Sequence, residues 1–166
     1  MAAGNPLPNY YASSPLTAAV LDGFRGLFHG DEKTPASKHL VEWGLITPTA
    51  ALVGAYQLLD YLVYYPFVDG DDTDTQTMDN TVTLPRYADG AGVMIMAVAV
   101  APTTGSGTFT VTYVNQDGVE KTSPTQSCST TSASIASIAT SQPAVAGMAP
   151  GPYLVLANGD TGVRSI

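Results

Sequence analysis

Basic residues are scarce in this sequence. Six lysines and arginines stand against fourteen aspartates and glutamates, which gives a net charge of −8 at pH 7. The basic residues are spread from Arg25 to Arg164 and form no cluster. Because phosphate backbones are bound by clustered lysine and arginine, the sequence does not predict direct nucleic-acid binding.

Charge of either sign is also low. Only 12% of the residues are charged, whereas 45% are hydrophobic; a soluble domain usually has about twice that share of charge. Threonine, serine, alanine, glycine and proline must therefore cover much of the surface. Since charge is depleted at the cores of interfaces, this composition suits a protein that packs against others.

Cysteine and long apolar runs are nearly missing as well. Cys128 is the only cysteine, which excludes an intrachain disulfide and a multi-cysteine zinc site; we interpret it as a small, partly buried hydrophobe. Residues 1–14 lack the basic start and apolar core of a signal peptide. The longest apolar run, residues 91–102, is too short for a membrane-spanning helix. We expect a soluble protein made in a cytoplasm, without a membrane partner.

Motifs of catalysis are absent too. The sequence contains neither a P-loop nor a GxGxxG fingerprint. Ser106 lies between two glycines, but a predicted strand follows it, whereas a nucleophile elbow leads into a helix. The two histidines, His29 and His39, show no metal-ligand spacing. We therefore expect no enzymatic activity and no cofactor.

An acidic run is the best candidate for a cation site. Its closely spaced carboxylates on a flexible loop would suit a hard cation such as Ca²⁺. It departs from the EF-hand pattern, because Asp74 replaces the obligatory glycine and Asn80 replaces the bidentate glutamate. A solvated acidic turn, or one that meets a basic patch on a partner, is the interpretation that we favour. The calcium candidates are Asp69, Asp71, Asp72 and Asp74, with Asp79 following.

The most readable local structure is a hairpin over residues 107–123. Threonines at 108, 110 and 112 alternate with Phe109, Val111 and Tyr113, which is the period of a half-buried strand. Residues 115–118, Asn-Gln-Asp-Gly, suit a type I turn in which Gly118 takes a positive φ. The chain then returns antiparallel over residues 119–123.

Further strands are predicted around this hairpin. Residues 81–85 alternate, residues 93–100 are nearly all apolar and predict a strand buried on both faces, and residues 153–156 and 162–166 also read as strands. No charged residue occurs from Thr122 to Gly159, a stretch that is either low-complexity or a polar strand. The pattern predicts an antiparallel β-sandwich or barrel over residues 61–166.

The first part of the chain has a different pattern. Three prolines within residues 1–15 predict an extended arm or a frayed terminus. Ser14-Pro15 then predicts a helix start, with Leu16, Val20 and Phe24 on one face, and Thr47-Pro48 predicts a second helix that ends near Asp60. The predicted fold class is α+β, organised as an arm (1–15), a helical region (16–60) and an antiparallel β-domain (61–166).

Three segments of the second half carry a resemblance. DGAGVMIMAVAV (89–100), TFTVTYVNQDGVEKTSP (108–124) and NGDTGVRSI (158–166) follow one another in this order. In this respect the chain resembles small structural proteins of tailed-bacteriophage virions. The resemblance implies a non-enzymatic, symmetry-bound virion component, and it assigns no catalytic residue. Members of that group continue with further strands past GVRSI, so we expect the polypeptide, or strand addition from a neighbour, to extend the sheet.

The resulting prediction is a capsid decoration (cement) protein that stabilises a phage head through many contacts between subunits. It would act in the virion, assembled in the host cytoplasm, as a homo-oligomer that contacts the major capsid protein or other virion proteins. A head-fibre or tail-associated adhesin, or a calcium-binding domain, are the alternatives. Aromatic residues are enriched at binding hot spots. The predicted interface residues are Asn9, Tyr10, Tyr11, Tyr64, Tyr65 and Phe67.

Overall fold

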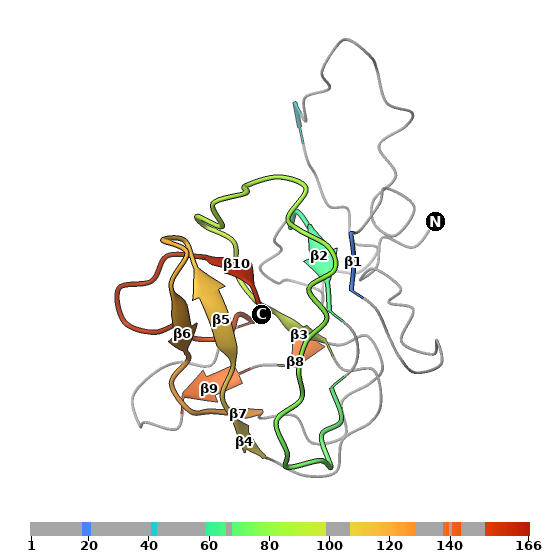
Figure 1. Cartoon of the computed structure of the whole chain (residues 1–166), viewed down its shortest axis with the longest axis vertical. Helices are drawn as coiled ribbons and strands as arrows, with labels where there is room; N and C mark the ends of the chain where they lie inside the picture. The colour runs from blue at the N-terminus through green and yellow to red at the C-terminus, as the bar shows by residue number, and fades with distance from the viewer. Residues whose placement is uncertain are drawn as a thin grey trace, which may run out of the picture.

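The computed structural model describes residues 18–20, 41–42, 59–65, 68–98, 107–128, 138–139, 141–143 and 152–166 (Figure 1). Within these ranges the protein is strand-rich, every strand pairs antiparallel, and no helix occurs. Two of the sheets have three strands, in the orders β10-β5-β6 and β4-β7-β9. The other two sheets, β1-β2 and β3-β8, have two strands each. The strands are β1 (Ala19–Val20), β2 (Val63–Tyr64), β3 (Ala97–Val98), β4 (Thr108–Phe109), β5 (Thr112–Asn115), β6 (Glu120–Thr122), β7 (Gln126–Cys128), β8 (Ile138–Ala139), β9 (Ser141–Pro143) and β10 (Val163–Ser165).

The predicted hairpin is confirmed, and it is longer than expected. β5 pairs with β6, with Thr112 opposite Thr122, and β4 pairs with β7, with Phe109 opposite Gln126. Two residues, 110–111, separate the outgoing strands, whereas three, 123–125, separate the returning ones. The returning side therefore carries one extra residue, which is a β-bulge.

Ser123 holds the ladder together at this bulge. Its backbone N–H donates to the Val111 carbonyl over 2.8 Å, and its Oγ accepts from the Val111 N–H over 2.9 Å. The hydroxyl thus takes the place of the backbone carbonyl that the bulge has turned away. The N–H of Val111, a half-buried residue, therefore keeps a hydrogen-bond partner at the bulge.

The hairpin turn has the predicted geometry. The Gly118 N–H donates to the Asn115 carbonyl over 3.0 Å, and Gly118 has a φ of +76°. The Asn115 side-chain oxygen also accepts from the backbone N–H groups of Asp117 (3.0 Å) and Val119 (2.9 Å). A buried asparagine therefore caps the turn from inside, which the type I pattern alone did not indicate.

A very close backbone crossing joins β10 to the segment that precedes β3. The N–H of Gly92 donates to the Thr161 carbonyl (3.0 Å), and the N–H of Val163 donates to the Val93 carbonyl (3.1 Å). A Cβ atom on Gly162 would lie 1.9 Å from the Gly90 carbonyl oxygen, and one on Gly90 would lie 2.6 Å from the Val163 carbonyl carbon. Only glycine fits at either position.

Arg164 and Gln116 fasten the hairpin tip to this crossing. The Arg164 Nε donates to the carbonyls of Asp89 (3.0 Å) and Gln116 (3.2 Å). In return, the Gln116 side-chain oxygen accepts from the N–H groups of Thr161 (3.0 Å) and Gly162 (3.2 Å). Three segments far apart in sequence, around residues 89, 116 and 162, are thereby tied to one another.

The predicted strand over residues 153–156 is reduced to a single bridge, in which Tyr153 pairs with Met96. The reason is Gln126, which is fully buried. Its side-chain amide donates to the Val155 carbonyl (3.2 Å), and its oxygen accepts from the Val155 N–H (2.7 Å). A side chain therefore satisfies the backbone groups that a neighbouring strand would otherwise bind.

Two other predicted strands are shorter or absent. Residues 81–85 form none, because Asp79 accepts from both the N–H (2.9 Å) and the hydroxyl (3.1 Å) of Thr81 and bends the chain there. Of the predicted strand 93–100 the structure describes residues 93–98, and among these Ala97–Val98 form β3. That segment is half-buried, and Met94 is 40% exposed, so it is not buried on both faces.

The predicted N-terminal helices are not confirmed. Where the first of them is described, Ala19 and Val20 form β1, paired with Tyr64 and Val63 of β2. Two β-branched valines opposite each other suit a strand pair, and this long-range pairing overrides the helical spacing. The predicted strand after Asp60 is present as β2. The predicted arm (1–15), most of the first helix and the second helix up to residue 58 lie outside the described residues.

The described core is small and contains polar side chains. Its buried hydrophobic residues are Ala18, Leu62, Tyr113, Leu154 and Val163. The largest fully buried side chains are Tyr113, Gln126 and Asn115, and two of these three are amides. Each makes side-chain hydrogen bonds, as buried polar groups must.

Replacement of Gly162 by alanine should destabilise the fold severely. Its Cβ would overlap the Gly90 backbone, so both segments would have to move. We expect a loss of about 3 kcal/mol or more in the free energy of unfolding, measured by denaturant titration. Gly107→Ala is the matched control, because its Cβ would meet nothing within 4 Å. Equal midpoints for the two variants would contradict the close crossing.

Candidate functional site

Two of the four predicted calcium ligands, Asp69 and Asp72, each bind a backbone N–H of their own turn through one carboxylate oxygen. Asp69 Oδ1 accepts from the Asp71 N–H (3.0 Å), and Asp72 Oδ1 accepts from the Asp74 N–H (2.9 Å). The Gln76 side chain closes the same loop, because it bonds both the N–H and the carbonyl of Asp69 at 2.8 Å. In the described part of the chain, no three His, Cys, Asp or Glu residues gather as a metal would need. The loop therefore has the geometry of a hydrogen-bonded acidic turn.

Of the predicted interface aromatics, the structure describes two. Tyr64 is part of β2 and Tyr65 follows it, and both are half-buried. The Tyr65 hydroxyl donates to Asn80 Oδ1 (2.9 Å) and accepts from the Ile166 N–H (3.2 Å). Asn80 Nδ2 in turn donates to the Ile166 carbonyl (2.7 Å). The Tyr65 hydroxyl is thus bound within the chain.

This closed ring of three residues affects the titration of the phenol. Burial raises the pKa of Tyr65, an effect that the bond from Ile166 partly opposes. The ring joins Tyr65, which follows β2, to Ile166, which follows β10. The other predicted interface residues, Asn9, Tyr10, Tyr11 and Phe67, lie outside the described residues.

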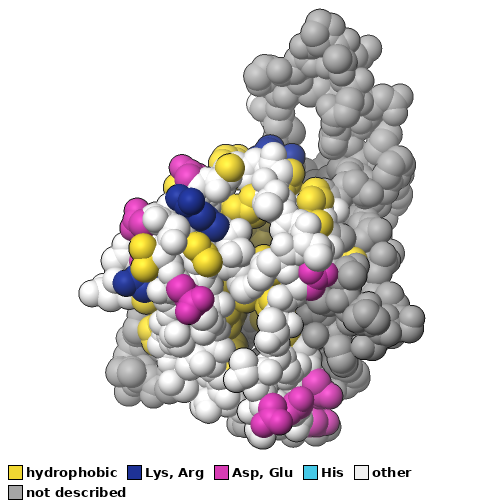
Figure 2. Space-filling view, in the orientation of Figure 1, with side chains coloured by type: hydrophobic (Ala, Val, Ile, Leu, Met, Phe, Trp, Pro, Cys, Tyr) yellow, Lys and Arg dark blue, Asp and Glu magenta, His cyan; other side chains and the backbone are white. Residues whose placement is uncertain are grey.

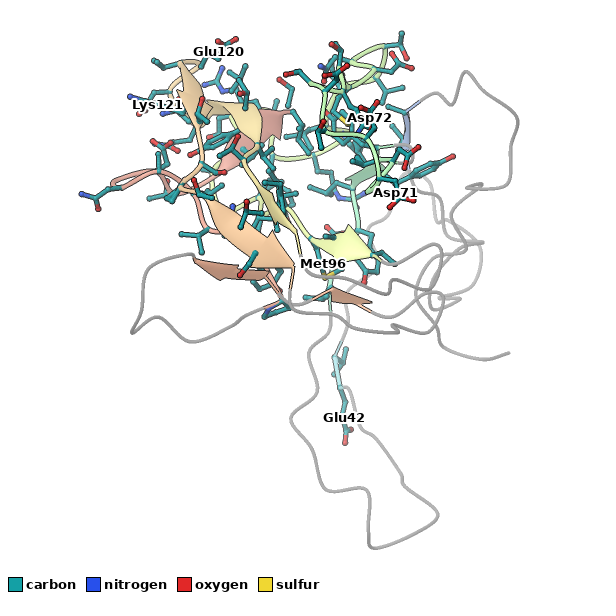
Figure 3. The ribbon with its side chains drawn as sticks, turned by 90° about the horizontal axis from the view of Figure 1, so that it is seen from below. Glu42, Asp71, Asp72, Met96, Glu120 and Lys121 are labelled. Atoms are coloured by element: carbon teal, nitrogen blue, oxygen red, sulfur yellow. The ribbon has the colours of Figure 1, made fainter. Side chains whose placement is uncertain are left out.

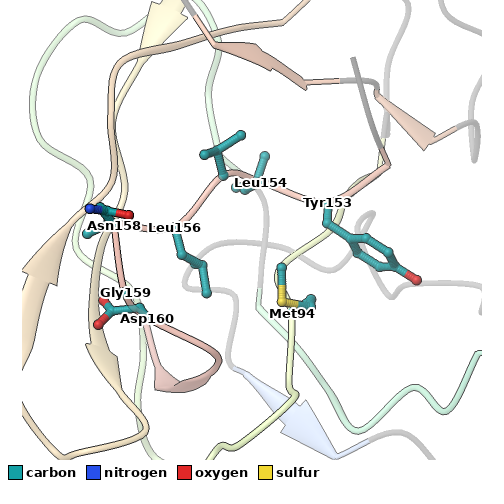
Figure 4. Close-up of a pocket in the computed structure, with 9 residues that line it drawn as sticks. Met94, Tyr153, Leu154, Leu156, Asn158, Gly159 and Asp160 are labelled. Atoms are coloured by element: carbon teal, nitrogen blue, oxygen red, sulfur yellow. The ribbon is translucent and has the colours of Figure 1, made fainter. Parts of the chain in front are cut away.

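A shallow surface hollow lies beside the hairpin. It has a volume of about 400 Å³ and is lined by Met94 and residues 153–160. Figure 4 shows Met94 and Leu156 on its apolar side and Asn158, Gly159 and Asp160 at one end. Its walls are mainly backbone and aliphatic side chains.

Asp160 is the acidic group of this hollow, and hydrogen bonds occupy both of its oxygens. Tyr113 donates its hydroxyl to Oδ2 over 2.6 Å, and Asn115 donates its amide to Oδ1 over 2.8 Å. These two bonds, with the charge of Lys121, lower the pKa of Asp160 below its ordinary value. Burial and the bond to Asp160 raise the pKa of Tyr113. Asp160 therefore stays ionised at neutral pH and anchors its turn to β5 through Tyr113 and Asn115.

Among the described strands, β6 lies at the edge of its sheet. Val119 and Ser123 bond inward to Asn115 and Val111, so by alternation the N–H and C=O groups of Glu120 and Thr122 point outward. All three β6 residues are exposed. Figure 3 places Glu120 and Lys121 at this edge, on the opposite side of the view from Asp71 and Asp72.

Charge opposes the pairing of this edge with a second copy of itself. Antiparallel pairing must place outward-pointing residues opposite each other, either Glu120 facing Glu120 or Glu120 facing Thr122. The second register sets Lys121 against Lys121 at the closest side-chain distance. Like charges in these positions are destabilising. A register centred on Thr122 brings in Pro124, which has no N–H to donate.

The rest of the visible surface offers no broad apolar patch among the described residues. In Figure 2, hydrophobic atoms form small separate areas between polar and charged atoms. The described residues also include no helix long and apolar enough to cross a membrane. Contact with a partner on this face would therefore combine polar and scattered apolar groups.

No family model, curated protein or solved structure that we compared matches this chain.

Protonation of Asp160 should weaken the anchor. Because its pKa is lowered in the fold, its contribution to stability is present above the unfolded-state pKa and is lost as the pH falls through the folded-state value. We expect Asp160→Asn to be less stable than the wild type at neutral pH, and the gap to shrink in acid. Denaturant midpoints measured over a pH series test this. A gap that is unchanged by pH would contradict it.

Removal of the charge at Lys121 should ease self-association. Lys121→Thr removes the like-charge pair at the centre of one register, and Lys121→Glu keeps a like-charge pair of opposite sign. We expect a roughly two- to fivefold stronger self-association for K121T than for K121E. Light scattering at several protein concentrations measures this. Equal association constants for the two variants would show that this edge is not controlled by charge.

Proposed function

We propose that this protein is a non-enzymatic virion structural protein, a capsid decoration protein that stabilises a phage head through contacts with neighbouring subunits. The observation that carries the proposal is the junction of residues 89–93, 116 and 161–164. All three segments of the resemblance meet there, and their characteristic residues bond backbone groups. The glycines, the glutamine and the arginine of these segments all serve to join backbone segments. Such a motif is typical of a structural protein.

The composition of the chain supports the same proposal. Charged residues make up 12% of the sequence, and 45% is hydrophobic, yet few of the described hydrophobic side chains are fully buried. Such a chain gains from surfaces that other subunits cover. In the finer form of the proposal, the strands after residue 60 close into a sandwich or barrel, and the N-terminal part contacts neighbours.

The mechanism would be additive. Each subunit would bury a modest neutral area against the major capsid protein or other virion proteins, and many copies in symmetric array would act together. Contacts that are weak singly become strong through multivalency. The β6 edge would not join identical copies, because of the charges on Glu120 and Lys121. Homo-oligomer contacts would instead involve the arm (Asn9, Tyr10, Tyr11) and the aromatic run around β2.

A ligand-binding module, such as a head-fibre or tail adhesin, is the second candidate. The open hollow beside Met94, Leu156 and Asp160 is the observation that favours it. This candidate predicts that the isolated protein binds a carbohydrate, whereas a decoration protein needs its shell. A calcium-binding domain is less well supported, because the Asp69 and Asp72 carboxylates cap their own turn.

Deletion of residues 1–15 tests the proposed role directly. We expect shells assembled with the major capsid protein of the same virus to bind much less of the shortened protein than of the full chain. The denaturant midpoint of the shortened protein should stay unchanged, because no described contact of the hairpin requires the arm. Equal occupancy of shells by the two proteins would refute the role of the arm. Failure of the full chain to bind any shell would refute the decoration function itself.

A further inference from the structure

The turn that carries Asp160 also presents an asparagine followed by glycine. The Asp160 N–H donates to the Ala157 carbonyl over 3.0 Å and closes a β-turn with Asn158 and Gly159 at its centre. Gly159 has a φ of +92°, and a Cβ there would meet nothing within 4 Å. Asn158 is exposed, and both residues line the open hollow, where water has access (Figure 4).

The groups needed for a reaction within this pair are free. In the part of the chain that the structure describes, no hydrogen bond involves the Asn158 side chain or the Gly159 N–H. Asn80 and Asn115 differ in this respect. Asn80 donates to the Ile166 carbonyl at 2.7 Å, and Asn115 is buried with both amide atoms bonded. Neither of them is followed by glycine.

We propose that Asn158 is a site of spontaneous deamidation, which converts this turn to an aspartate or isoaspartate form. The Gly159 backbone nitrogen attacks the Asn158 side-chain carbonyl carbon and loses its proton to solvent. The C–N bond to the side-chain amide breaks, and that nitrogen leaves as ammonia. Water then opens the resulting succinimide at either carbonyl, which gives aspartate or isoaspartate. No oxidant or enzyme is required.

The isoaspartate product changes the anchor next to it. The β-linkage routes the backbone through the side chain and adds one carbon atom between Asn158 and Gly159. Asp160 lies two residues after Asn158, and its carboxylate must keep its position to accept the hydrogen bonds from Tyr113 and Asn115. Both products also place a second negative charge beside Asp160. We therefore expect the modified turn to detach from β5 more readily.

The test is to incubate the purified full chain in mildly alkaline buffer and to follow residue 158 by peptide mass mapping. A free peptide with the sequence of residues 153–164, incubated under the same conditions, gives the reference rate of deamidation in an unfolded chain. We expect Asn158 in the folded protein to gain the mass that replaces an amide NH₂ by OH, with Asn80 and Asn115 unchanged. Asn158→Gln is the matched control, because its longer side chain closes the ring far more slowly. An unmodified Asn158 after the peptide has fully converted would overturn the proposal.

A second measurement separates the chemistry from its structural effect. Hydrogen exchange at the Ala157 N–H, which donates to the Tyr113 hydroxyl over 2.8 Å, reports on the anchor. We expect faster exchange in the isoaspartate form than in Asn158→Asp, which adds the charge but leaves the backbone length unchanged. Equal exchange in the wild type and the isoaspartate form would overturn the proposed loosening, while the mass result decides on the modification itself.

Discussion

The close crossing of Gly90 and Gly162 is the constraint on which the described fold depends. At this point two backbones approach so closely that no side chain fits between them. Arg164 and Gln116 then bind backbone groups on both sides of the crossing and bring the hairpin tip to it. The position of β10 next to β5, and therefore the three-stranded ladder, follows from this one contact.

The contacts that could be predicted from the sequence join residues close together in the chain, whereas the contacts that were missed join residues far apart. Alternation and the Asn-Gln-Asp-Gly turn were enough for the hairpin, because its partners lie within a few residues of one another. The role of Gln126 was hidden, because Val155 is a sequence-distant partner and a glutamine in a polar run carries no sign of burial. Likewise, helical spacing around Val20 gave no hint that Val63 would pair with it.

The candidate site was predicted even less completely. The acidic run drew attention because its charges are closely spaced, yet Asp69 and Asp72 each bind the backbone N–H two residues further on. Asp160, which anchors a turn through Tyr113 and Asn115, comes directly after the uncharged stretch 122–159 and was missed. The only signal in the sequence was an aspartate directly after Asn-Gly, since nothing in the sequence shows that it lies opposite Tyr113. Buried amides whose polar atoms are bonded make the core rigid and favour one arrangement of the chain over others.

The bulge at residues 123–125 has a consequence for how this chain can change. On either side of it, inward and outward positions follow opposite parity, because the returning strand has one residue more than its partner. Loss of a single residue there would equalise the two sides, and Gln126 would still face Phe109, now across a regular ladder. The local bend and the stronger twist that a bulge gives its strand would be lost. A slip of β7 by one residue against β4 would, by contrast, turn its side chains to the other face and take Gln126 away from Val155.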